Sequence, residues 1–293
     1  MDQTSLFDLE DDLSSQIVGV VADGQGVIYR QLQTESYQNY IQFNAITMAV
    51  LQYNNAWMTH APKDWENAFV SINDALSTHH ENALMLALLS NVYYADALHE
   101  LNLAPNSRAR MEPLAQKAVS LDPHLQIARY NLVLQNAFFG RVEECVAEAR
   151  EVLSLNRSHA RVMAGCAFAV TTVGDYDFGL KLIERAKQLN PHYPSWYHFV
   201  NYLVHFKNGA FEKAWIEAQR IEVKGLVWHS LLRASVLGKL GRIKEGSAFL
   251  DDLVQMKPEF PKRPHEYIRA LVVLDKHVEM ICDGLYKAGL KNL

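Results

Sequence analysis

Apolar positions recur with a helical period along most of the chain. Between Ser36 and Met256, large apolar residues return every three or four positions, as in "WENAFVSINDAL" and "VEECVAEAREVLSL", with charged residues between them. No run in this region alternates apolar and polar residues with a period of two, which is the pattern of a half-buried strand. The pattern predicts an all-α protein in which the chain from Ser36 onward is helical.

The helical pattern is itself repeated. The short motifs "LDP", "LN" and "LNP" begin at Leu121, Leu155 and Leu189, so they return at intervals of 34 residues. Glycines keep nearly the same spacing, and each lies between two apolar runs of helical period, where one helix must end and another begin. These glycines are Gly140, Gly174, Gly209 and Gly241. A fixed period of this length is typical of a solenoid of helix pairs.

Small residues mark the second helix of each predicted pair, for example Ala68 with Ala75 and Ala214 with Ala218. Two helices approach closely only where the side chains between them are short. We therefore predict six helix-turn-helix units, at about 44–80, 81–122, 123–156, 157–190, 191–224 and 225–258. Residues 259–293 are predicted to form C-terminal capping helices that cover the open end of the apolar stack, as a solenoid requires.

The residues of the second unit resemble the tetratricopeptide repeat (TPR) family. Leu86, Leu89, Ser90 and Tyr93 match the large, large, small and aromatic positions of the first helix of that family. Prolines at 123, 191 and 258 fall where the family ends its second helix, whereas "HELNLAPNS" lengthens the central turn of the second unit. The resemblance implies a right-handed α-solenoid of about six TPR-like units, and a protein or peptide partner.

Two segments resemble a narrower group. "GLYKAGL" and "NPHYPSWYHF" are similar to the C-terminal TPR regions of bacterial proteins in which the repeats follow an adenylate cyclase or a winged-helix regulator domain. A TolB-like segment that ends in a helix like "LFDLEDDLSSQIVGVV" often precedes the repeats in those proteins. The resemblance implies an interaction module in bacterial signalling or transcription regulation, with the repeat region alone represented in this sequence.

Residues 1–43 are predicted to form an N-terminal helix, a turn and a lead-in to the solenoid. The helix spans about Leu6 to Val21, and the turn follows at Asp23 to Gly26. The glycines of "GQGVIYR" do not make a phosphate loop, because such a loop needs a preceding strand and a following lysine and hydroxyl, or a third glycine.

Charge and composition narrow the function classes. With 28 basic and 33 acidic residues the formal net charge is −5, which disfavours binding to nucleic acid. The acidic start lacks the pattern of a secretory signal, and no apolar run approaches the ~18 residues of a membrane span. Three cysteines without metal-ligand spacing indicate reduced, packed thiols. We expect a cytoplasmic protein with no membrane contact.

No catalytic or metal-binding pattern stands out. His79 and His80 have no acidic or cysteine partner at ligand spacing, and His198 and His205 are separated by ~10 Å along a helix, too far to share one zinc easily. The pairs of adjacent acidic residues at 143–144 and 251–252 point to different sides of a helix and are interpreted as solvated. We predict no enzyme, no metal and no cofactor, while an enzyme with an unrecognised site stays an alternative.

The resemblance also implies an inner wall. In the TPR family the first helix of each unit lines the concave surface, and its inward positions carry over to a set of mostly aromatic residues here. We expect His60 among them, and a partner to contact Tyr53, Trp57, Asn91, Tyr94, Tyr130, Arg161, Phe168, His198, Tyr202, His205 and Trp228.

The stretch "YPSWYHFVNYLVHF" divides into two helical faces. Trp196, Phe199 and Leu203 follow the spacing of a core stripe, whereas His198, Tyr202 and His205 lie on the opposite face and are predicted to point inward. Three readings of this wall stay open. It packs aromatics only for stability, it captures a peptide or a second copy of the chain, or it senses a small ligand in a cavity.

Overall fold

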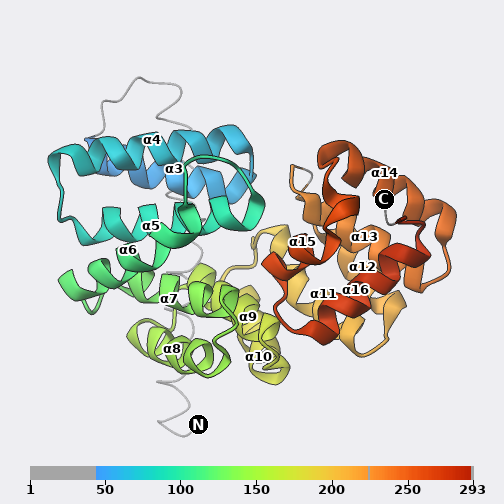
Figure 1. The fold of residues 1–293 in the computed structure, drawn as a ribbon. Helices are drawn as coiled ribbons and strands as arrows, with labels where there is room; N and C mark the ends of the chain where they lie inside the picture. Colours follow the sequence, from blue (N-terminus) through green and yellow to red (C-terminus); the bar gives the residue numbers. More distant parts are fainter. Residues whose placement is uncertain (1–43, 224, 292–293) are drawn as a thin grey trace, which may run out of the picture.

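The computed structural model describes residues 44–223 and 225–291, and within them the chain is helical without any strand (Figure 1). The expected N-terminal helix and lead-in of residues 1–43 lie outside the described residues. The α-helices are α3 (Ala45–Thr59), α4 (Pro62–Thr78), α5 (Ala83–His99), α6 (Ser107–Leu121), α7 (Gln126–Phe138), α8 (Val142–Leu155), α9 (Ala160–Thr172), α10 (Tyr176–Leu189), α11 (His198–Lys207), α12 (Phe211–Arg220), α13 (Val227–Lys239), α14 (Ile243–Met256), α15 (Pro264–Leu271) and α16 (Asp275–Lys287). Short 3-10 helices, η1 (Ser195–Tyr197) and η2 (Phe260–Lys262), precede α11 and α15.

Successive helices pack as antiparallel pairs, from α3 with α4 to α13 with α14. The predicted fold class is therefore confirmed: a right-handed α-solenoid of six helix pairs, followed by two further helices. The turn inside a pair is often closed by a glycine in the left-handed region, such as Gly140 with φ 72° and Gly209 with φ 73°. Glycine suits this position because it has no Cβ to clash with the following carbonyl.

The two helices of a pair differ in how much of their surface is covered. In α5 nearly every side chain from Met85 to Asp96 is buried, whereas α12 buries little more than Ala214, Glu217 and Ala218. This difference follows from position, because the first helix of each pair is enclosed by its neighbours and the second presents a polar face to water. The inner layer is thus built from first helices, and any concave site must be made by them.

The long turn of the second unit is held by one carboxylate. Asp96 accepts hydrogen bonds from the backbone N–H of Leu103 at 3.1 Å and of Ala104 at 3.3 Å, and from the hydroxyl of Ser107. The lengthened turn that "HELNLAPNS" predicts is confirmed, because α5 ends at His99 and α6 begins only at Ser107.

The solenoid turns far enough for its sixth unit to meet its second. The indole Nε1 of Trp228 in α13 donates to Nδ1 of His99 at the end of α5, at 3.2 Å. Beside this bond, Glu100 forms ion pairs with Lys257 at 3.5 Å and with Arg263 at 3.6 Å. These contacts join residues more than 120 positions apart in the sequence, so the inner wall is enclosed by the chain itself.

The last helix covers the sixth unit through a glycine contact. A Cβ on Gly238 in α13 would lie 1.9 Å from the carbonyl oxygen of Gly284 in α16. The same helix reaches the fourth unit, where Nε2 of His277 hydrogen-bonds with the hydroxyl of Tyr176 at 2.5 Å. The backbones of α13 and α16 are therefore in direct contact, and no larger side chain fits between them.

We predict that Gly238→Ala destabilises the protein even though alanine favours helix by about 1 kcal/mol. The added methyl group meets backbone, which cannot rotate away, so the free energy of unfolding falls by about 1–3 kcal/mol in urea titrations.

Gly179→Ala in α10 is the matched control. There the added Cβ would meet the side-chain hydroxyl of Thr171 at 2.0 Å, and the nearest backbone atom, the carbonyl oxygen of Ala167, lies at 3.1 Å, so we expect a smaller loss than at Gly238. Equal losses at the two positions would contradict the contact between backbones.

Candidate functional site

A buried hydrogen-bond network joins the inner helices of the first units. The carboxamide oxygen of Asn91 in α5 accepts from the hydroxyl of Tyr53 and from Nε1 of Trp57, both at 2.9 Å. Its Nδ2 donates to Oδ1 of Asn131 in α7 at 2.8 Å. Arg161 in α9 extends the network, because its guanidinium donates to the Tyr53 hydroxyl at 3.2 Å. Four residues of the predicted wall are thus brought together, but their polar groups form hydrogen bonds with one another.

Asn131 was missed by the sequence reasoning. Its Nδ2 donates to the carbonyl oxygen of Ala87 at 2.6 Å, and its side chain is 1% exposed. The signal was present in "YNLVLQNAF", where the amides of Asn131, Gln135 and Asn136 stand among apolar residues. A buried amide of this kind must find partners, so its position was a sign of a polar contact between helices.

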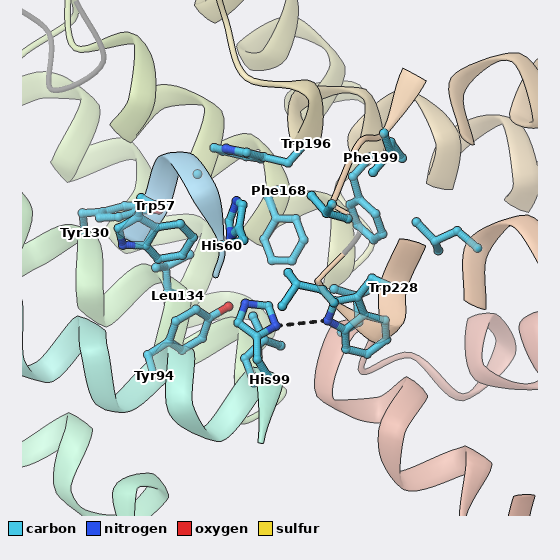
Figure 2. A pocket seen from close by; sticks show the side chains of 17 residues that line it. Trp57, His60, Tyr94, His99, Tyr130, Leu134, Phe168, Trp196, Phe199 and Trp228 are labelled. Atoms are coloured by element: carbon cyan, nitrogen blue, oxygen red, sulfur yellow. Dashed lines mark hydrogen bonds between the residues drawn. The ribbon is translucent and has the colours of Figure 1, made fainter. Parts of the chain in front are cut away.

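Next to the network lies an aromatic cavity of about 90 Å³ (Figure 2). Six residues of the predicted wall line it, and they come from the first helices of five units or, for His60, from the residue that ends the first of these helices. Most of the side chains around it are buried. The lining consists of Trp57, His60, Tyr94, Leu98, His99, Tyr130, Leu134, Gly165, Phe168, Trp196, Phe199, Ile221, Val223, Leu226, Trp228, Leu232 and Leu271.

The fifth unit contributes different rings from those that were expected. Trp196 and Phe199, assigned to the core stripe, line the cavity, whereas His198, Tyr202 and His205 do not. The reason is that residues 195–197 form the 3-10 helix η1 and α11 begins only at His198. A 3-10 helix advances by 120° per residue instead of 100°, so a single α-helical period carried through this stretch assigns the faces incorrectly.

His198, Tyr202 and His205 have other surroundings. Nδ1 of His198 lies 2.7 Å from Oε2 of Glu217 in α12, the partner helix of the same unit. Burial alone would raise the pKa of Glu217, but the hydrogen bond and the charges of His198 and Arg220 lower it. Tyr202 is fully buried, donates to the carbonyl oxygen of Leu232 at 3.2 Å and stacks on Phe206, while the side chain of His205 is half-buried. These residues stabilise the stack.

His60 is one of the two imidazoles that line the cavity. It follows the last residue of α3 with φ 53°, is 7% exposed, and lies in Figure 2 between Trp57 and Phe168. Both ring nitrogens are buried and make no hydrogen bond to any residue that the structure describes. Burial lowers the pKa of His60 to about 4, so the imidazole is neutral at pH 7.

His99 is the second imidazole of the cavity, and sequence reasoning did not find it. Its ring centroid is 6.3 Å from that of His60. Burial, with smaller contributions from His60 and Lys257, lowers the pKa of His99 to about 3. The only polar contact of its ring among the described residues is Nδ1 with Trp228, because Nε2 is buried without a partner. The sequence pattern did not indicate His99 because its hydrogen-bond partner, Trp228, lies 129 positions away in the chain.

The cavity lining carries no Asp, Glu, Lys, Arg or Cys, so its ionisable groups are the two imidazoles and the tyrosine hydroxyls. The cysteines lie elsewhere in the core, and burial raises the pKa of Cys145 to about 12 and, helped by Glu279, that of Cys282 to about 11. Across residues 44–223 and 225–291, no cluster of three or more potential metal ligands is found. In the same ranges no helix is both long and apolar enough for a membrane crossing.

Comparison with known proteins gives distant likenesses, and these are to solved structures. No family model matches the chain, and no curated protein matches it. Among solved structures the chain is similar to the crystal structure of yeast Tom70, with 11% sequence identity and a TM-score of 0.45. The match covers 97% of this chain and 75% of that chain.

We predict that Asn91→Ala lowers the free energy of unfolding by about 2–4 kcal/mol, because it leaves buried partners of the carboxamide unsatisfied. Chemical denaturation measures the loss. Gln116→Ala on the exposed surface of α6 serves as the control and should change stability by no more than about 0.5 kcal/mol. A loss of that small size for Asn91→Ala would contradict the network.

The histidines also predict that acid destabilises the protein. The folded-state pKa values of His60, His99 and His277 are about 4, 3 and 4, below the ordinary 6.5, so between pH 6.5 and 4 the unfolded chain binds more protons than the folded one. Stability is therefore fully present above pH 6.5 and falls as the pH drops, by about 5–6 kcal/mol between pH 7 and pH 5.

Denaturation at several pH values measures this slope. His60→Asn keeps a residue that tolerates positive φ and removes one titrating group, so the slope should become shallower. An unchanged slope would show that His60 does not contribute.

Proposed function

We propose that the protein is a non-catalytic helical-repeat binding module whose inner wall takes a small molecule. The observation that carries the proposal is the cavity of about 90 Å³, lined by aromatic and aliphatic side chains and by two neutral imidazoles. Ligand sites are mostly apolar cavities with a few polar groups that fix orientation, and this cavity has that character.

The burial of the inner wall supports a small ligand over a polypeptide. Tyr53, Asn91 and Tyr202, which were expected to contact a partner, are each at most 2% exposed, and Arg161 is 7% exposed. A peptide needs a row of exposed side chains and backbone contacts along a groove. Here the sixth unit lies across the wall and contacts the second unit through Trp228.

Enzyme chemistry has less support. A nucleophile needs an activating base or a lowered pKa, whereas burial raises the pKa of Cys145 and Cys282 and keeps the thiols protonated. His60 and His99 lack a carboxylate partner in the cavity lining, and an orienting partner of that kind is the usual support for a catalytic imidazole.

Binding of another protein is the second candidate, and the outer surface favours it over the inner wall. Val70, Ile216 and Ile243 on second helices are each about half exposed, at 51%, 48% and 56%. A partner, or a second copy of the chain, would use these convex positions.

Two sequence predictions stay predictions. One is the setting in bacterial signalling or transcription regulation, and the other is the division into repeats at 44–258 and a cap at 259–293.

Benzene tests the proposal as a minimal probe of the cavity. Binding to the folded state alone raises the melting temperature by mass action, and we expect a rise of about 2–5 °C near saturation. Leu134→Phe, which adds a ring to the lining, should abolish the rise.

Leu132→Phe is the matched control, because it makes the same change in the same helix at a half-buried position outside the lining. It should keep the response to benzene. If wild type and both variants respond equally, or if none responds, the cavity is not a binding site.

A further inference from the structure

We infer that the cavity selects a neutral, flat molecule of about one ring that carries a hydrogen-bond acceptor, and that Nε2–H of His99 binds the acceptor. The inference rests on the proposed function and adds the chemical class of the ligand. It follows from the tautomer of one histidine, from the unpaired polar atoms around it, and from the size and charge of the cavity.

The tautomer of His99 is fixed by Trp228. An indole Nε1–H can only donate a hydrogen bond, so Nδ1 of His99, 3.2 Å away, must be the acceptor. A neutral imidazole carries one proton, which then resides on Nε2. This N–H is buried and has no partner among the described residues. The bond with the sixth unit thus leaves one donor of His99, its Nε2–H, available at the cavity.

Two further polar side chains of the lining also have buried atoms without a hydrogen-bond partner among the described residues. Nε1 of Trp196 is an obligate donor, and it is buried without a partner among the residues that the structure describes. His60 supplies one donor and one acceptor, since neither of its nitrogens is bonded. Leaving a buried donor unsatisfied costs free energy, and a ligand that satisfies these groups recovers it. Donors outnumber acceptors, so the ligand must carry an acceptor.

The walls set the shape of the ligand. Aromatic rings surround the space, including Trp57, Phe168, Phe199 and Trp228, as Figure 2 shows. Their faces and edges suit a flat apolar body, because aromatic rings gain from offset or edge contacts. The volume of about 90 Å³ is smaller than the ~150 Å³ of a known cavity that binds benzene, so the cavity admits no more than about one ring, and the lining side chains must move slightly to take it.

The charge of the ligand follows from the lining. No acidic or basic side chain borders the cavity, and both imidazoles are neutral at pH 7. An ammonium or a carboxylate would enter without a counter-ion and would lose its hydration. The guanidinium of Arg161, a residue of the predicted wall, lies over the Tyr53 ring and donates to its hydroxyl.

A pair of isosteric probes tests the inference on the full chain. Benzonitrile and ethynylbenzene have the same shape, but only the nitrile nitrogen is a good acceptor. The quenching of tryptophan fluorescence reports their binding, because Trp57, Trp196 and Trp228 line the cavity. We expect benzonitrile to bind about fivefold more tightly than ethynylbenzene, and benzoate and benzylammonium to bind more weakly than either.

Variants identify which donor of the protein binds the acceptor of the ligand. His99→Phe alone would free the indole Nε1–H of Trp228 as a new donor, so the double variant His99→Phe/Trp228→Phe should reduce the fivefold preference to about one. Trp196→Phe tests the second donor and should retain most of the preference. The nitrile stretch of bound benzonitrile in wild type needs no variant: it should lie at higher frequency than in toluene, as for a nitrile that accepts a hydrogen bond.

The outcomes separate this inference from the proposed function. If benzene and both probes bind but the two probes bind equally, the cavity is a ligand site and the selection of an acceptor is wrong. Tighter binding of benzoate than of benzonitrile overturns neutrality, and a nitrile stretch like that in toluene overturns the hydrogen bond. If none of the neutral probes binds, the proposed function fails and this inference with it.

Discussion

The inner wall depends on one buried carboxamide. Asn91 in α5 accepts from Tyr53 and Trp57 in α3 and donates to Asn131 in α7, so a single side chain connects the first helices of three units. Arg161 brings in the fourth unit through Tyr53. Buried polar groups are costly unless every partner is present, and this requirement sets the register of the units against one another. The position of the aromatic rings beside the network follows from that register.

The inner wall has two parts, the hydrogen-bond network and the cavity. Polar atoms at Tyr53, Asn91 and Asn131 are satisfied within the protein, whereas those of His60 and the Nε2–H of His99 are not. Native proteins rarely leave buried polar groups unpaired without a reason, and the binding of a ligand is one such reason. Because the sixth unit supplies Trp228, the cavity exists only when the solenoid has turned back on its second unit.

The sequence predicted the fold well and the site in part. Helix pairing depends on local signals, namely the apolar period and glycines such as Gly140, so six units were predictable. Trp57 and Phe168 line the cavity because regular first helices present a regular inward face. The prediction failed at Trp196 and His198, where a 3-10 helix breaks the period, and at His99, whose surroundings come from a helix 129 residues away. Contacts of that range are set by the superhelix and not by any single repeat.

Diffraction from crystals of the full chain under xenon gas tests the central claim most directly. Xenon enters apolar cavities and is seen as a strong isolated peak. The account predicts one peak enclosed by Trp57, Phe168 and Trp228, within van der Waals distance of the His60 ring. A cavity filled by protein side chains or by a polypeptide segment, with no xenon among these residues, would contradict the claim that the inner wall encloses a site for a small molecule.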